Sequence, residues 1–178
     1  MKKFSLFLIF FSFFVFADEL NESFAAAVQA GNVKTATEVF AKGADINFVD
    51  EDWPLFVTAV TSGDVAMTEF FIKNGVNLEL KGPDGKTALL HAISLKNKKI
   101  VDMLLAAGAE IKTEDAAGKD TLMYAVKQNL FSVVKKLLEL GADPTLRQVE
   151  GKTALDIAKS QNNQSLARIL SEAEKKWR

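Results

Sequence analysis

The chain has 178 residues, and its 22 Lys and Arg residues against 23 Asp and Glu give a formal net charge of −1. This balance gives no reason to expect nucleic acid or an anionic membrane surface as the main partner. The chain has no cysteine, which excludes disulfides, thiolate metal sites and cysteine nucleophiles. Its length suits one domain or one short repeat array.

The N-terminal segment 1–17, MKKFSLFLIFFSFFVFA, is typical of a secretory signal peptide. Lys2 and Lys3 precede an apolar run of roughly 13 residues, which is shorter than the roughly 20 residues that a membrane-spanning helix needs. Val15 and Ala17 supply the small or modest side chains that a signal peptidase requires, so we expect cleavage after Ala17. An uncleaved membrane anchor and a buried core helix are the alternatives.

Cleavage would remove two lysines and leave 20 basic and 23 acidic side chains, a net charge of −3. The sequence has no second apolar run long enough to span a membrane. The short Lys-Lys start and the Phe-rich core look bacterial. We therefore expect a periplasmic or secreted product that has no membrane partner once the signal is removed.

A period of about 33 residues organises the rest of the chain. A glycine marker recurs at nearly constant steps in the segments KGAD (42–45), NGVN (74–77), AGAE (107–110) and LGAD (140–143). An alanine marker recurs in the same register at Ala27, Ala59, Ala92, Ala125 and Ala158. A third marker comprises DGKTAL (84–89), AGKDTL (117–122) and EGKTAL (150–155). Three markers in one register predict a repeat architecture.

Each repeat is expected to contain a turn, a helix, a short loop and a second helix, as the third repeat illustrates. Pro83-Asp84-Gly85 has the chemistry of a turn, and Thr87 is placed to cap the first helix with its hydroxyl. Lys96-Asn97 is expected to end that helix. The apolar stripe of the second helix lies within Ile100–Leu105, and Gly108 ends it in the left-handed conformation that glycine tolerates.

The stretches DGKTALLHAI and LLAAGAEI, together with the period, resemble the ankyrin repeat. The resemblance covers about residues 20–172. It implies an all-α ankyrin-repeat solenoid of about five helix-turn-helix repeats with β-hairpin fingers. The expected segments are the signal peptide at 1–17 and repeats at about 19–49, 50–82, 83–115, 116–148 and 149–178. Within the first repeat we expect helices at 22–30 and 33–42, and the last repeat should end in a helix from 165 to about 174.

Gly85-Lys86-Thr87 and Gly151-Lys152-Thr153 resemble the end of a phosphate-binding loop. Such a loop needs a glycine five residues before its last glycine, but those positions hold Leu80 and Leu146. No strand is expected before either stretch. We therefore interpret both as finger turns that lead into capped helices.

His91 is the only histidine, and it falls one place after the position where ankyrin repeats carry one. The sequence has no signature for the acid or nucleophile that a catalytic histidine would need. Asp50-Glu51-Asp52 lacks the ligand spacing of a calcium loop, and we interpret it as a solvated acidic finger. We expect no catalytic residue, cofactor or metal site. His91 is interpreted as a half-buried packing or surface residue, with a contact to a binding partner as the alternative.

The resemblance implies that other proteins bind at the finger tips and at the exposed side of the first helix of each repeat. On the fingers these positions are Asp50, Glu51, Trp53, Pro83, Asp84, Lys86, Ala116, Ala117, Lys119, Glu150 and Lys152. On the helices they are Thr61, Ser62, Ser94, Leu95, Lys127, Gln128, Ser160 and Gln161. Trp53 is of a residue type that is enriched in interface hot spots. Its alternative is a packing role that compensates for Pro54, which comes one residue earlier than the proline of the ankyrin pattern.

The leading hypothesis is an exported, monomeric ankyrin-repeat scaffold that binds another protein in the periplasm and has no enzymatic activity. The alternative is an inhibitor or immunity-type protein that blocks a periplasmic toxin or hydrolase, since a mildly acidic chain suits a basic target. An enzyme, supported by His91 alone, and a purely structural spacer are further alternatives.

Overall fold

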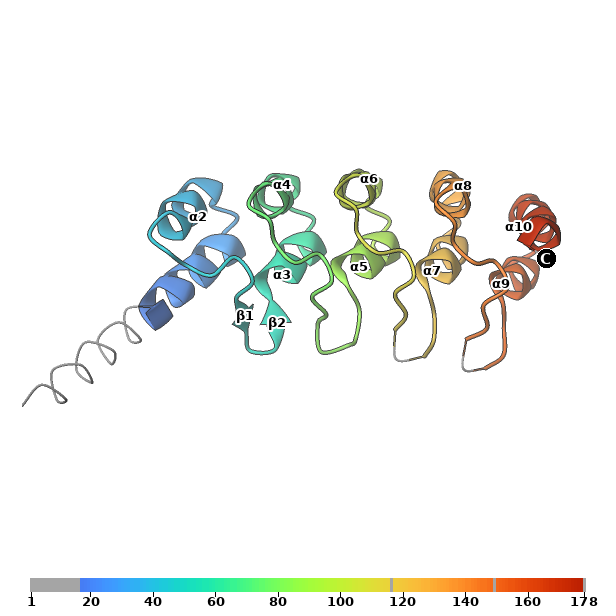
Figure 1. Ribbon diagram of the computed structural model, residues 1–178, viewed down its shortest axis with the longest axis horizontal. Helices are drawn as coiled ribbons and strands as arrows, with labels where there is room; N and C mark the ends of the chain where they lie inside the picture. The colour runs from blue at the N-terminus through green and yellow to red at the C-terminus, as the bar shows by residue number, and fades with distance from the viewer. Residues whose placement is uncertain (1–16, 116, 149, 178) are drawn as a thin grey trace, which may run out of the picture. The chain divides into compact units, whose positions relative to one another are not determined.

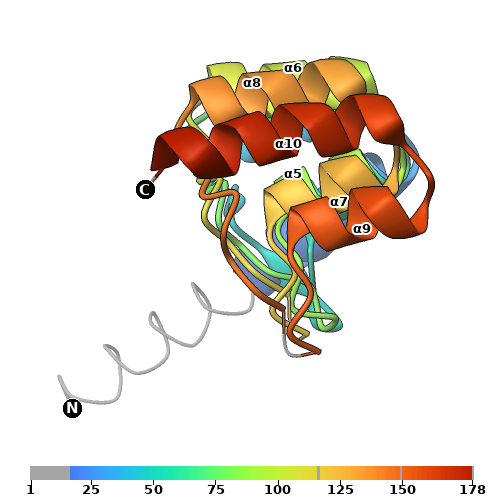
Figure 2. The same cartoon turned by 90° about the vertical axis from the view of Figure 1, so that its right-hand side faces the viewer.

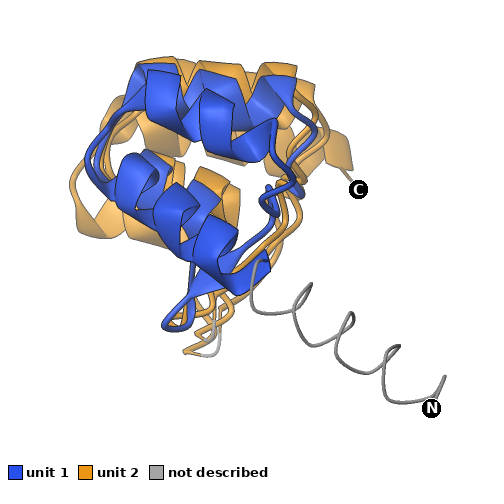
Figure 3. Cartoon of the chain, turned by 90° about the vertical axis from the view of Figure 1, so that its left-hand side faces the viewer, with its two compact units in different colours: residues 1–77 blue, residues 78–178 orange. Residues whose placement is uncertain are grey.

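A computed structural model describes residues 17–115, 117–148 and 150–177 (Figure 1). The predicted signal peptide lies outside these residues, apart from Ala17. The chain divides into an N-terminal unit, residues 1–77, and a C-terminal unit, residues 78–178 (Figure 3). Within the described residues, no helix has both the length and the apolar character that crossing a membrane requires.

The N-terminal unit contains two helix pairs joined through one β-hairpin. Its elements are a helix over residues 17–29, α2 (Val33–Phe40), β1 (Val49–Asp50), β2 (Trp53–Pro54), α3 (Leu55–Thr61) and α4 (Val65–Lys73). The described part of the first helix already includes residue 17, ahead of the predicted start at 22. Within this helix the Asn21 side chain accepts a hydrogen bond from the backbone N–H of Asp45 at 2.9 Å, which ties the helix to the loop after α2.

The core of the N-terminal unit is aromatic. Phe24, Phe56 and Phe71 are fully buried. The ring of Phe71 lies 5.7 Å from that of Phe24 and 5.6 Å from that of Phe56, with the tilted geometry that aromatic pairs prefer. Phe40 and Phe70 extend the cluster with an edge-on contact at 5.9 Å. Neighbouring repeats in this unit are therefore joined by ring contacts between helices.

The C-terminal unit contains three helix pairs. They are α5 (Ala88–Ser94) with α6 (Lys98–Ala106), α7 (Thr121–Lys127) with α8 (Phe131–Glu139), and α9 (Ala154–Ser160) with α10 (Gln164–Trp177). Figures 1 and 2 show α5, α7 and α9 side by side in one layer and α6, α8 and α10 in a second layer. We call these the inner and the outer helices. The all-α helical repeat fold predicted from the sequence is confirmed.

Local sequence explains where these helices begin and end. Thr87 accepts a hydrogen bond from the Leu90 backbone N–H and caps α5, as predicted. Lys96 has a positive φ of 58°, and Asn97 caps α6, so the predicted break between the two helices is confirmed. Gly108 has a φ of 87°, and α6 ends just before it, because glycine adopts this conformation without strain.

The fingers differ from the expectation of a β-hairpin in every repeat. Among the described residues, only the second repeat forms paired strands, with Asp50 opposite Trp53. The third and fourth repeats each have a single antiparallel bridge, between Lys81 and Thr87 and between Glu114 and Asp120. Their turns are longer than that of the second repeat, so the pairing stops farther from the tip.

The last helix is longer than predicted. α10 continues to Trp177, whereas we expected an end near residue 174. The outer helices α6 and α8 stop before Gly108 and Gly141, but the equivalent position in α10 is Glu174. Without a glycine there, nothing favours a left-handed stop, and one more turn of helix forms.

Candidate partner-binding surfaces

The finger of the second repeat presents its acidic residues on a tight turn. Asp50 and Trp53 are paired, and Glu51 and Asp52 between them have φ angles of 45° and 73°. Pro54 follows and occupies the cap position of α3, where it offers no side-chain hydrogen bond. The early proline therefore takes the place that Thr87 holds in the third repeat.

A depression of about 370 Å³ lies between this finger and the helices of the N-terminal unit. Its lining consists of Gln29, Asp50, Glu51, Trp53, Thr58 and Thr61. The Gln29 amide donates to Asp50 Oδ2 at 3.0 Å, which fixes one carboxylate at the edge. Trp53 is only half-buried, so part of its indole faces the depression. We call these six residues the Trp53 surface.

The charge of the Trp53 surface is one-sided. Two carboxylates, Asp50 and Glu51, line it, and its other members are an indole, an amide and two hydroxyls. An aromatic face beside carboxylates favours a cationic group, because the ring quadrupole and the negative charges attract the same partner. The surface is therefore suited to a Lys or Arg side chain.

In the C-terminal unit, Asp84 gathers two basic residues at the finger of the third repeat. Its Oδ2 accepts from Lys86 Nζ at 2.9 Å, and its Oδ1 lies 3.3 Å from His91 Nε2. Of the predicted finger residues, Asp84 and Lys86 are thus in contact, while Pro83 stands exposed beside them. His91 is only 8% exposed, which makes it more buried than the half-buried residue we expected.

The pKa values of His91 and Asp84 are both lowered in this cluster. Burial lowers the pKa of His91 below 6.5, because the protein interior disfavours the charged imidazolium, and this outweighs the attraction of Asp84. Burial alone would raise the pKa of Asp84, but hydrogen bonds from Lys86 and the nearby His91 bring it below its ordinary value. His91 is therefore more readily neutral than an exposed histidine.

Tyr124 occupies in the fourth repeat the position that His91 occupies in the third, one period earlier. Its hydroxyl donates to Asp115 Oδ2 at 2.7 Å, and Lys86 Nζ lies 6.0 Å from the centre of its ring. Burial raises the pKa of Tyr124, and the Asp115 carboxylate raises it further. Burial by itself would raise the pKa of Asp115. The hydrogen bonds that its carboxylate accepts from Tyr124 and from backbone N–H groups of the turn outweigh burial, so the pKa of Asp115 is lowered.

The sequence did not point to Tyr124 or to Asp115. The available signal was the period itself, because positions 58, 91, 124 and 157 form one series. Three of its members, Thr58, His91 and Tyr124, have polar atoms in their side chains. Gln29 was also missed, since its contact with Asp50 crosses from one repeat to the next and has no local pattern.

The remaining predicted residues are spread over the C-terminal unit. Glu150 and Lys152 form an exposed ion pair at 3.2 Å. The hydroxyl of Ser94 donates to the Leu90 carbonyl, so it serves its own helix, whereas Leu95 beside it is 54% exposed. Lys127 is exposed, Gln128 and Lys119 are half-buried, and Ala116 lies outside the described residues. Among the residues that the structure describes, no three acidic or histidine side chains come together to hold a metal ion.

Two family models match the chain. One, described as ankyrin repeats in three copies, matches residues 24–115, and another, described as ankyrin repeats in many copies, matches residues 104–158. Together they cover both units and most of the described helices. No match was found among curated proteins.

Proposed function

The chain belongs to the ankyrin repeat family, and from this premise we propose that it is an exported, non-catalytic scaffold whose partner binds at the Trp53 surface. Ankyrin repeats generally mediate binding to other proteins. The observation that carries the choice of surface is the joint presence of Trp53, Asp50 and Glu51 around one depression. Trp is one of the residue types enriched at interface hot spots, and polar residues line the depression beside it.

The partner is expected to present a basic side chain to this surface. Asp50 and Glu51 would pair with it at the rim, and the indole of Trp53 would pack against its apolar stem. Such contacts favour a rapid, salt-dependent association, because opposite charges steer the two proteins together. A non-catalytic role is supported by His91, whose burial leaves little of its imidazole accessible to a substrate.

Export is the part of the proposal that rests on the sequence alone. Residues 1–17 have the basic start, short apolar run and small residue at position 17 that a signal peptidase substrate requires. N-terminal sequencing of the protein isolated from cells is expected to give Asp18 as the first residue. A sequence that begins upstream of the apolar run would show that the signal is not removed.

The binding surface is tested by crosslinking in cells followed by mass spectrometry. A partner recovered with the unmodified protein should be lost with Trp53→Ala and reduced with the double variant Asp50→Asn, Glu51→Gln. Phe131→Ala is the matched control, because Phe131 is a large exposed apolar residue outside the fingers. Recovery of the same partner with Trp53→Ala as with the unmodified protein would show that the partner binds elsewhere.

A further inference from the structure

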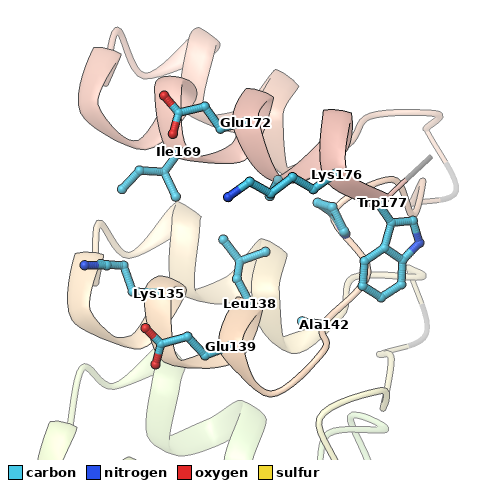
Figure 4. Close-up of a pocket in the computed structure, with 10 residues that line it drawn as sticks. Lys135, Leu138, Glu139, Ala142, Ile169, Glu172, Lys176 and Trp177 are labelled. Atoms are coloured by element: carbon cyan, nitrogen blue, oxygen red, sulfur yellow. The ribbon is translucent and has the colours of Figure 1, made fainter.

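A second depression lies on the C-terminal unit, between the outer helices α8 and α10 (Figure 4). Its volume is about 490 Å³, within the range of ligand pockets in proteins. It exists because α10 continues past Glu174 to Trp177. Lys176 and Trp177 of this added turn line the depression together with Ala142 and Pro144, which follow α8. We call it the α8–α10 groove.

The floor of the α8–α10 groove is apolar. Ile169, Ala173 and Trp177 recur at every fourth position of α10, so they form one stripe along the helix. Leu138 projects from α8 toward this stripe, as Figure 4 shows. Trp177 is 48% exposed at one end of the groove, which leaves a large indole surface in contact with water.

The charge of Lys176 on the rim is not offset by an ion pair. Glu172 is paired with Arg168 at 3.2 Å, whereas Lys135 and Glu139 on α8 form no ion pair with any described residue. Lys176 forms no ion pair with any residue that the structure describes. Figure 4 shows its side chain lying across the groove, with its ammonium group between α8 and α10.

We propose that the α8–α10 groove binds a short segment of a partner protein in which an apolar side chain stands next to a carboxylate. The apolar side chain packs between Leu138 and Ile169 and against the indole of Trp177, and the carboxylate pairs with Lys176. Charge complementarity selects this occupant. Glu172 is paired with Arg168, whereas the lining residues Lys135, Glu139 and Lys176 form no ion pair among the described residues. Two ammonium groups and one carboxylate are thus left around the groove, and this excess of positive charge favours a carboxylate. This site lies on the outer helices and does not depend on the Trp53 surface.

The size of the groove argues against a second copy of the chain as the occupant. The groove follows about two turns of α10, from residue 169 to residue 177, and little more than one turn of α8, so its length is roughly 12 Å. A stable dimer interface buries at least roughly 1,200 Å² in total, far more than a groove of this length provides. A single side chain with its neighbouring carboxylate matches it better.

Two small probes that differ only in charge test the proposal. N-acetyl-L-leucine carries an apolar side chain and a carboxylate, whereas N-acetyl-L-leucinamide is neutral. In ¹H–¹⁵N spectra of the protein, N-acetyl-L-leucine is expected to shift the Trp177 indole N–H and the amides of α8 and α10. N-acetyl-L-leucinamide should bind more weakly, by about fivefold in dissociation constant, because it lacks the charge-assisted contact.

Variants separate the two parts of the site. Lys176→Gln should remove the preference for the carboxylate, and Trp177→Ala should weaken both probes. Lys99→Gln, which changes an exposed lysine of the outer helix α6, should leave both affinities unchanged. Circular dichroism establishes that each variant is folded, and Lys176→Gln remains a test even if Trp177→Ala does not fold.

Three outcomes would overturn the proposal. They are equal binding of the two probes, shifts confined to residues outside the groove, and no shifts at millimolar probe concentrations. Sedimentation provides a further check, because self-association that is lost with Trp177→Ala would assign the groove to a second copy. None of these results depends on the partner at the Trp53 surface, so the two proposals fail independently.

Discussion

Asp50 and Trp53 are paired across a tight turn, and the two residues of that turn, Glu51 and Asp52, have positive φ angles. This is the pattern of a type I′ turn, for which Asn-Gly is the favoured sequence. Acidic residues are strained in this conformation, and the corresponding turns of later repeats place Gly85, Gly118 and Gly151 at positive φ.

We predict that the double variant Glu51→Asn, Asp52→Gly stabilises the N-terminal unit by about 1 kcal/mol, because it relieves the strain at both positions. Urea unfolding measures the change as a higher midpoint with an unchanged slope. The same variant should bind the partner of the Trp53 surface less tightly, since it removes Glu51. A lower midpoint would show that the two carboxylates stabilise the turn.

His91 provides a direct readout of the third finger, because the chain has one histidine and its imidazole signals are unambiguous. An NMR titration is expected to give a pKa below 6.5. Asp84→Asn should lower this pKa further, since the carboxylate that favours the imidazolium is removed. Asp102→Asn is the control, because Asp102 contacts Lys136 on the outer helices instead.

The lowered pKa of His91 also fixes the sign of its effect on stability. The native state takes up its proton at a lower pH than the unfolded chain, so the unfolded chain binds more protons in the interval between the two pKa values. The contribution is fully present above pH 6.5 and is lost as the pH falls through the native pKa. A His91 pKa above 6.5 would contradict both statements.

The repeat period predicted the fold because it records contacts that recur in every copy. Thr87 and Gly108 act locally, one as a cap and the other as a stop, so each could be recognised from a few neighbouring residues. The end of α10 could not be placed in this way. The helix continues because position 174 holds a glutamate where earlier repeats have a glycine. A helix end without such a glycine has no marker in the sequence.

The candidate surfaces were predicted less well because they depend on contacts between repeats. Trp53 and Asp50 were recognised by residue type at a finger tip. Gln29 and Tyr124 join these surfaces through side chains whose direction is set by packing. The α8–α10 groove likewise forms from two helices of different repeats, with the last finger and α9 between them in the sequence.

Tyr124→Phe tests the link between the fourth finger and its inner helix. The variant removes the hydroxyl that donates to Asp115, while the ring stays in place. Asp115 also accepts from the backbone N–H groups of Ala117 and Lys119, so the finger loses one of several supports. We expect the free energy of unfolding to fall by about 1 kcal/mol, measured by urea unfolding at pH 7. An unchanged value would show that water replaces the lost bond without cost.

Asp120 caps α7 at the position where the third and fifth repeats have Thr87 and Thr153. It is only 3% exposed, and burial raises its pKa to about 6, although the Met123 backbone N–H opposes this shift. Glu114 and Asp143 raise it further. At pH 7 the protein therefore keeps a buried carboxylate ionised at a cost in stability.

Asp120→Thr should remove this cost while keeping a capping oxygen, and we expect it to stabilise the protein at pH 7 by about 2 kcal/mol. Because the native pKa is raised, the native state binds more protons than the unfolded chain between about pH 4 and 6. The stability of the unmodified protein should fall as the pH rises through this interval. The variant should lose that part of the pH dependence and match the unmodified protein near pH 4.

Asp120→Asn separates charge from shape, since it keeps the size and the capping oxygen. If both variants were less stable than the unmodified protein at pH 7, the ionised cap would be stabilising.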